Sequence, residues 1–250
     1  MPRLRLLQLN NARLRGDYEE FPRKLRWLCW HGFPLDSIPS GLHLESLVAL
    51  DMRNSSLKQA WNGNKLEKFP TELGQMESLK MLLADGIGIN QSPSMTTGVR
   101  SWPSYFRDWL LGPRRSPESI SFSLCSLPRS LSVLGLAGCN LSDGAIPKDI
   151  GSLSLLQRLD LRNNPICILP ESVKFLTMLR SLSLDNCTTL QLLPELPMSL
   201  RSLDLFECRS LEMITNLPNL LDSLYLYITD CDKLTEVQGL FNPLETFMKY

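Results

Sequence analysis

The chain has 250 residues, 43% of them hydrophobic and 21% charged, a composition typical of a globular protein with a sizeable core. Its formal net charge is zero, which argues against a strongly basic nucleic-acid binder and against a polybasic membrane-surface protein. The N-terminal residues lack the apolar core of a signal peptide, and no apolar run approaches the roughly 20 residues of a membrane span. We therefore expect the seven cysteines to be reduced thiols.

A nine-residue phrase recurs along the chain, with leucine at positions one, four and six and cysteine or asparagine at position nine. Adjacent starts in the regular part lie 21 to 25 residues apart, within the period of about 20 to 29 residues of leucine-rich repeats. We therefore predict one leucine-rich-repeat domain over residues 1–250, with about nine repeats. The copies begin at Leu4, Leu25, Leu47, Leu79, Leu131, Leu156, Leu179 and Leu200, and a weaker copy contains Leu226, Ile228 and Cys231.

The spacing of the phrase predicts the local structure of each repeat. Positions four and six are two residues apart, so their side chains lie on the same face of a short strand. One repeat cannot bury this leucine row alone, but stacked repeats form a continuous core. The predicted fold is an α/β repeat, a curved leucine-rich-repeat horseshoe with parallel strands on its concave face. At position nine, Asn would bond the backbone of the turn, and the cysteines (Cys139, Cys187, Cys208 and Cys231) would form a buried ladder.

Proline-containing segments fill the other half of the repeats. AIPKDIGSL (145–153) and ILPESVKFL (168–176) predict one-turn or 3₁₀ helices, and LLPELPMSL (192–200) predicts extended backbone on the convex side. Residues 90–120 are too long for one repeat and predict an irregular insertion. In it, Trp102, Tyr105, Phe106 and Trp109 have helical spacing and would either pack on the solenoid or dock a partner.

Residue patterns for catalysis or metal binding are sparse. The chain has only two histidines, His31 and His43, and neither lies in an HExxH or cysteine-rich metal motif. Cys29 falls at an outward position beside His31, and we interpret it as a lone surface thiol. We therefore predict a protein without enzymatic activity, cofactor or metal.

Charged and aromatic side chains occupy the strand positions that point away from the leucine core. Basic residues concentrate at positions two and three, and acidic residues at positions five and seven, so stacking would place a basic row beside an acidic row. The two rows would either pair with each other across neighbouring strands or form an electrostatic docking surface with aromatic anchors. The candidate partner-binding residues are Arg26, Trp27, Arg158, Asp160, Arg180, Asp185, Arg201, Asp204, Phe206, Tyr225 and Tyr227.

Several segments resemble one family over essentially the whole chain. Residues 25–61, beginning LRWLCWHGFPLDSIPSGLHLESL, resemble the opening repeats of plant TIR–NB–LRR disease-resistance proteins of the tobacco N-protein type. Residues 66–89, 140–173 and 193–212 resemble later repeats of that family. The TIR and nucleotide-binding domains are missing, and no G-x-x-x-x-G-K-[ST] loop occurs.

The resemblance implies a recognition and regulatory module of an intracellular immune receptor, cytoplasmic or nucleocytoplasmic. Its partners would be proteins: a pathogen effector or host guardee, and the nucleotide-binding and TIR domains of a full-length receptor. Neither nucleic acid nor membrane is an expected partner. The alternative is an extracellular receptor ectodomain that binds a peptide or protein. NLSDGAIPKDIG echoes the repeats of plant receptor kinases, and N-x-S/T sequons begin at Asn54, Asn90, Asn140 and Asn186.

Overall fold

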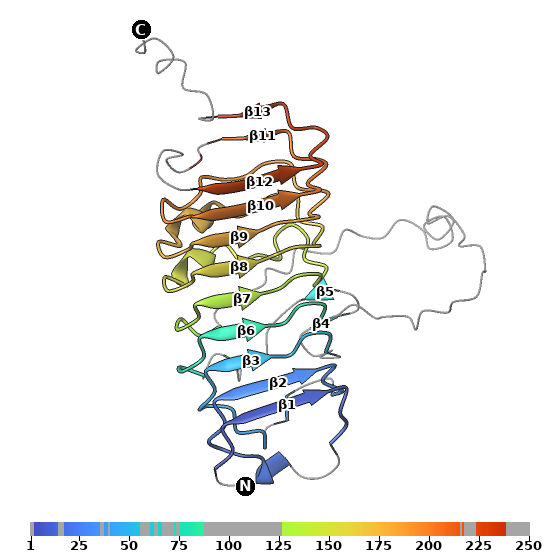
Figure 1. Ribbon diagram of the computed structural model, residues 1–250, viewed down its shortest axis with the longest axis vertical. Coiled ribbons are helices and arrows are strands. Elements are labelled where there is room, and N and C mark those ends of the chain that lie inside the picture. Colours follow the sequence, from blue (N-terminus) through green and yellow to red (C-terminus); the bar gives the residue numbers. More distant parts are fainter. Residues whose placement is uncertain are drawn as a thin grey trace, which may run out of the picture.

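The fold is a stack of single-strand turns, seen in a computed structural model of the chain. The structure describes residues 3–14, 18–35, 38–39, 41–55, 61–62, 65–66, 73, 76–87, 127–215, 217 and 224–238. Within these residues, nine parallel strands form one sheet in the order β1-β2-β3-β6-β7-β8-β9-β10-β12 (Figure 1). Their bounds are β1 Leu6–Asn10, β2 Trp27–His31, β3 Ala49–Asp51, β6 Met81–Leu83, β7 Val133–Gly135, β8 Arg158–Asp160, β9 Ser181–Ser183, β10 Ser202–Phe206 and β12 Tyr225–Thr229.

The strands pair in the register that the repeated phrase predicts. Position four aligns with position four along the sheet, as Leu159 does with Leu182 and Leu182 with Leu203. These leucines, with those at positions one and six, belong to one continuous buried core that runs through the stack. Each fully buried leucine contributes about 1.5–3 kcal/mol of transfer free energy, and its contacts come largely from the adjacent repeats. The predicted leucine-rich-repeat fold is confirmed.

An aromatic cluster fills the core near the N-terminal end of the solenoid. Trp30 stands at position six, where the repeats of β7, β8, β9 and β10 have leucine, and it is completely buried. Its ring meets Phe33 edge-on at 4.9 Å between centroids and stacks with Phe21 at 6.3 Å. The indole Nε1 donates to the carbonyl of Ala12 at 3.1 Å, so the polar atom of this large side chain is satisfied.

Every repeat ends its strand with one left-handed residue at position eight. The φ angles there lie between 50° and 67°. Asparagine and glycine occupy most of these positions because they adopt this conformation at little steric cost. The turn directs the chain from the strand into the return half of the repeat. The nine residues are Asn11, Gly32, Asn54, Gly86, Gly138, Asn163, Asn186, Glu207 and Asp230.

From the β7 repeat onward, the side chain at position nine donates a hydrogen bond to the preceding repeat. The thiols of Cys139, Cys187 and Cys208 donate to the position-six carbonyls of Ala84, Leu161 and Leu184 at 3.1, 3.3 and 3.2 Å. Burial raises the pKa values of these three thiols to about 12, 11 and 12, so they stay protonated at neutral pH. The predicted buried ladder is confirmed for these three cysteines; the fourth, Cys231, makes the equivalent bond to the Leu205 carbonyl at 3.0 Å but is only half-buried.

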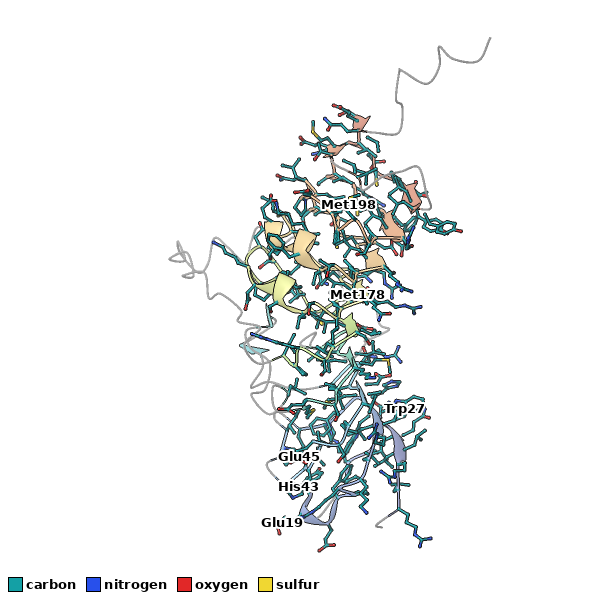
Figure 2. The ribbon with its side chains drawn as sticks, turned by 90° about the vertical axis from the view of Figure 1, so that its left-hand side faces the viewer. Glu19, Trp27, His43, Glu45, Met178 and Met198 are labelled. Atoms are coloured by element: carbon teal, nitrogen blue, oxygen red, sulfur yellow. The ribbon has the colours of Figure 1, made fainter. Side chains whose placement is uncertain are left out.

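The return half of the repeats carries little helix. The 3₁₀ segments η3 (Ile150–Ser152) and η4 (Glu171–Phe175) fall within the two proline segments that predicted them. In Figure 2 they lie away from the strand side, which Trp27 marks. Residues 192–200 contain no helix, and Leu192 forms isolated parallel bridges with Ile168 and Met213, which agrees with the predicted extended backbone.

Short elements complete the described structure. The 3₁₀ turn η1 (Tyr18–Glu20) lies between β1 and β2. An antiparallel pair, β4 (Trp61–Asn62) and β5 (Lys65–Leu66), falls in the irregularly spaced stretch before Leu79, and β11 (Met213–Ile214) pairs with β13 (Glu236–Val237) in parallel. The predicted insertion at 90–120, with its aromatic helix, lies outside the described residues.

We predict that Asn164→Ala lowers the free energy of unfolding by about 2–4 kcal/mol. Asn164 is buried at position nine, where its Nδ2 donates to the Leu136 and Leu161 carbonyls at 2.9 and 2.8 Å. Its Oδ1 accepts from the Leu141 N–H at 2.9 Å, so alanine leaves these buried groups unpaired. Urea unfolding measures the effect. Asn163→Gly is the control, since Asn163 is exposed and left-handed and loses only an exposed hydrogen bond from Asn186 Nδ2, and we expect a change within about 0.5 kcal/mol. An equal loss of unfolding free energy in the two variants would contradict the role given to the buried hydrogen bonds of Asn164.

Candidate protein-binding surface

Eight of the eleven sequence-predicted binding residues stand at positions three, five or seven, on the side of the strands that faces away from the leucine core, here called the strand face. Alternation along each strand produces this arrangement, because positions three, five and seven point opposite to positions four and six. Arg26, Arg180 and Arg201 stand at position two, directly before their strands, and are exposed. Nine of the eleven candidates come from the repeats of β8, β9, β10 and β12, which are adjacent in the sheet. Arg26 and Trp27 belong to the β2 repeat. With β3, β6 and β7 between, they lie roughly 19 Å from the rest at the usual strand spacing.

Exposed aromatic rings cluster at the C-terminal part of this face. Tyr225 and Tyr227 stand on the same side of β12, with 64% and 58% of their surface exposed. Their partners in the adjacent strand are Ser202 and Asp204, and Phe206 is exposed at the end of that strand. Large aromatic side chains that are left uncovered are typical of protein-binding surfaces.

The carboxylates of this region accept hydrogen bonds from their own surroundings. Arg162 forms a two-pronged pair with Asp160, with Nη2 to Oδ2 at 2.7 Å and Nε to Oδ1 at 2.9 Å. Asp204 accepts from the hydroxyl of Ser183 at 2.8 Å, and Asp185 accepts from the backbone N–H of Phe206 at 3.0 Å. These acidic groups are therefore satisfied by neighbours at positions three, five and seven.

The basic row is organised differently. Arg158 and Arg180 are exposed, and neither has a side-chain hydrogen bond or ion pair with another described residue. Of the two interpretations of the charge pattern, pairing between the basic and acidic rows is therefore not seen for these two arginines. The two arginines come from neighbouring repeats, with Arg201 on the next one; Arg158 is at position three, and Arg180 and Arg201 are at position two.

A polar cluster between β2 and β3 was missed by the sequence interpretation. Cys29, expected as a surface thiol, is only 6% exposed, so that expectation was wrong. Its Sγ lies 3.3 Å from His31 Nε2 and 3.9 Å from Asp51 Oδ2, and His31 Nε2 lies 3.0 Å from the same carboxylate oxygen. The signal available in the sequence was a Cys-x-His pair at positions five and seven, followed in the next repeat by Asp at position five.

The cluster does not form a relay for nucleophilic catalysis. A relay would need the thiol and the carboxylate on different ring nitrogens, whereas both approach Nε2 of His31. Burial raises the pKa of the Cys29 thiol, and the nearby Asp51 charge raises it further. Cys29 is therefore kept in its weakly nucleophilic protonated form.

Arg53 holds the carboxylate of this cluster. Burial alone would raise the pKa of Asp51, but hydrogen bonds from Arg53 and His31 outweigh burial and leave the pKa below its ordinary value. The guanidinium Nη2 and Nε lie 2.8 and 2.9 Å from the two carboxylate oxygens. Asp51 is therefore an ionised, nearly buried group.

Comparison with characterised proteins confirms the resemblance to TIR–NB–LRR disease-resistance proteins. The chain is 35% identical over 175 residues to TMV resistance protein N of Nicotiana glutinosa, which covers 69% of the chain and 14% of that protein. It is 34% identical over 142 residues to disease resistance-like protein DSC1 of Arabidopsis thaliana, covering 55% of the chain and 11% of the relative. The chain thus spans about a seventh or less of the length of these relatives. No family model matches it.

Among solved structures, the chain is similar to the Leptospira interrogans LRR protein LIC12759, with a TM-score of 0.48 and 20% identity. The match covers 94% of the chain and 66% of that protein. Within the described residues, no helix has the length and apolar character that a membrane span requires.

We predict that Arg53→Ala lowers the free energy of unfolding by about 1–3 kcal/mol at pH 7 and by much less at pH 3. Without the guanidinium, burial dominates and the folded-state pKa of Asp51 rises, so the ionised carboxylate destabilises the fold above that pKa. Below the unfolded-state pKa of about 3.8 the group is protonated in both states and the penalty disappears.

Urea unfolding at the two pH values tests this prediction. Arg162→Ala is the matched control, because it removes the same kind of pair from a more exposed carboxylate. We expect the control to lose at most about 1 kcal/mol. An Arg53→Ala loss of the same size at both pH values would mean that the arginine acts through the packing of its apolar stem.

Proposed function

We propose that this chain is a non-enzymatic recognition and regulatory module of a plant immune receptor. The similarity to plant disease-resistance proteins supports this proposal. The observation that carries it is the surface of the β8 to β12 repeats, where Arg158 and Arg180, which pair with no other described side chain, occur in the same four adjacent repeats as the exposed rings of Phe206, Tyr225 and Tyr227. A surface with free cations and uncovered aromatic rings is suited to binding a protein.

The charges define the kind of partner that this face would bind. Asp160 is paired with Arg162, and Asp204 and Asp185 accept hydrogen bonds from Ser183 and Phe206, so Arg158, Arg180 and the exposed aromatic rings are the groups we assign to contact with a ligand. A partner with acidic side chains flanking apolar ones would pair with the arginines and cover Tyr225 and Tyr227. Charge complementarity would set the orientation and the association rate, and the buried rings would supply most of the affinity.

The partners in the proposal are proteins: a pathogen effector or a host protein that an effector modifies, and the nucleotide-binding and TIR domains of a full-length receptor. The aromatic pair on β12 is a natural anchor for the first class. Arg26 and Trp27, roughly four strand spacings away, provide a second contact area on the same face. Two separated areas would allow the module to hold a receptor domain at one and a partner at the other.

Reversing the charges of Arg158, Arg180 and Arg201 should weaken binding of these protein partners. We predict that Arg158→Glu/Arg180→Glu/Arg201→Glu weakens capture of specific partners at least about 10-fold, because an acidic face repels an acidic ligand. Pull-down from plant tissue with quantitative mass spectrometry, using the full chain as bait, measures the loss. Circular dichroism checks that the variant remains folded.

The control carries a charge reversal on another side of the solenoid. Lys148 is exposed in the turn before η3, so Lys148→Glu should retain the partners of the unsubstituted chain. Capture that is unaffected by the triple substitution, or lost equally in the control, would contradict binding through the strand face.

We propose a cytoplasmic or nucleocytoplasmic location, as in the family that the chain resembles. The sequons Asn54, Asn140 and Asn186 then remain unmodified. Asn186 Nδ2 already donates to Asn163 Oδ1 at 2.7 Å, an arrangement that a glycan would disrupt. Protein isolated from plant cells should show no change in gel mobility after glycosidase treatment. A mobility shift would favour the extracellular receptor ectodomain instead.

A further inference from the structure

A thiol, an imidazole and a carboxylate converge on one point between β2 and β3. Cys29 and His31 are two residues apart and point to the same face of β2, the face on which Figure 2 labels Trp27. Asp51 is the register partner of Cys29 in the next strand, so the two side chains stand next to each other. The ligand atoms of the three residues all lie within 4.8 Å of one another.

The distances between these atoms lie within a few tenths of an ångström of those between the ligand atoms of a tetrahedral metal ion. A tetrahedral zinc ion with the usual Zn–S, Zn–N and Zn–O lengths separates its ligand atoms by roughly 3.3–3.6 Å. The observed separations are 3.3 Å for Sγ–Nε2, 3.9 Å for Sγ–Oδ2 and 3.0 Å for Nε2–Oδ2. Shifts of a few tenths of an ångström would bring all three atoms into contact with one ion.

We propose that Cys29, His31 and Asp51 bind a zinc ion that cross-links β2 to β3. Thiolate, imidazole and carboxylate together suit Zn²⁺, which accepts sulfur, nitrogen and oxygen ligands. Three protein ligands leave the fourth position for water or for a group from a partner. His31 is about one-third exposed whereas Cys29 and Asp51 are buried, so the ion enters from the strand face past the imidazole.

Zinc binding changes the protonation of one of the three ligands. The Cys29 thiol loses its proton to solvent when the Zn–S bond forms, and Nε2 of neutral His31 coordinates through its lone pair with the ring proton on Nδ1. Asp51 is already ionised and releases nothing. One proton per zinc is therefore released from the thiol.

Arg53 becomes the outer partner of the carboxylate in this arrangement. Its Nε and its backbone N–H bond Oδ1 of Asp51 at 2.9 and 3.3 Å, and these bonds leave Oδ2 available for the ion. Nη2 lies 2.8 Å from Oδ2 and 3.4 Å from His31 Nε2, so it must turn away when zinc binds. The side chain is 41% exposed and has solvent to turn into.

Cobalt spectroscopy on the reduced full chain tests the proposal, with Co²⁺ as a visible substitute for zinc. We expect a thiolate-to-cobalt charge-transfer band in the near ultraviolet and tetrahedral-type bands in the visible, all removed by one equivalent of Zn²⁺. Cys29→Ser should abolish the charge-transfer band. His31→Gln should weaken cobalt and zinc binding by more than about 100-fold, since outer-shell changes alone cost 10- to 100-fold.

A second cysteine provides the matched control. Cys167 is partly exposed on the return side of its repeat, with Asp143 near it, so Cys167→Ser should leave the spectrum unchanged. Zinc at about 100 times its Kd should raise the Tm of the unsubstituted chain by roughly 5 °C or more, and that of the folded His31→Gln variant by none.

Two other outcomes would contradict the proposed zinc site. An absent charge-transfer band, or one that persists in Cys29→Ser, would reduce the cluster to a hydrogen-bonded network without metal affinity. A Tm rise of equal size in His31→Gln would assign the stabilisation to other residues. The zinc site does not rest on the proposed immune function, and failure of either leaves the other standing.

Discussion

The burial of one leucine row by the next is the interaction on which the rest of this molecule depends. A three-residue strand such as β8 or β9 has no independent stability, because its apolar face would remain in water. Stacking in register removes that face from water and also pairs the backbone groups along the sheet. The left-handed turn at position eight and the donor at position nine then return the chain so that the next leucine row falls on the previous one.

The same stacking explains how a surface can be specified independently of the fold. Leucines at positions one, four and six are fixed by the core, whereas positions three and five of the same strands point away from it. Ser181, Ser202 and Tyr225 follow one another at position three without any change in backbone register. Chemistry on the strand face is therefore free to differ from repeat to repeat.

Sequence periodicity predicted the fold because the features that determine it are local and repeated. The leucine spacing, the buried Asn164 and the proline segments around η3 and η4 each depend on residues within a single repeat or its neighbour. The outward direction of Arg158, Tyr225 and Tyr227 also followed from strand alternation. Whether those residues bind a partner is a separate question that alternation does not address.

Sequence periodicity could not predict the arrangement of side chains around Cys29. Alternation places position five on the strand face, but exposure there depends on which large side chains stand at positions five and seven of adjacent repeats. His31 and Asp51 approach the thiol and bury it, whereas the equivalent alignment beside Tyr227 leaves the aromatic ring exposed. Asp51 pairs with Arg53, and Asp160 pairs with Arg162, in each case two residues further along the chain. These pairs depend on side-chain geometry, which the pattern of charges in the sequence does not predict.

One strand per repeat also has a consequence for how the molecule comes apart. Each turn touches only its immediate neighbours, so loss of structure can begin at either end and progress one turn at a time. The aromatic pair on β12 belongs to the last strand of the sheet, whereas Trp30 and the Cys29 cluster lie near its other end. The β2–β3 area and the β12 area therefore unfold locally as separate units. We expect the backbone amide hydrogens of these strands to exchange with solvent on different timescales.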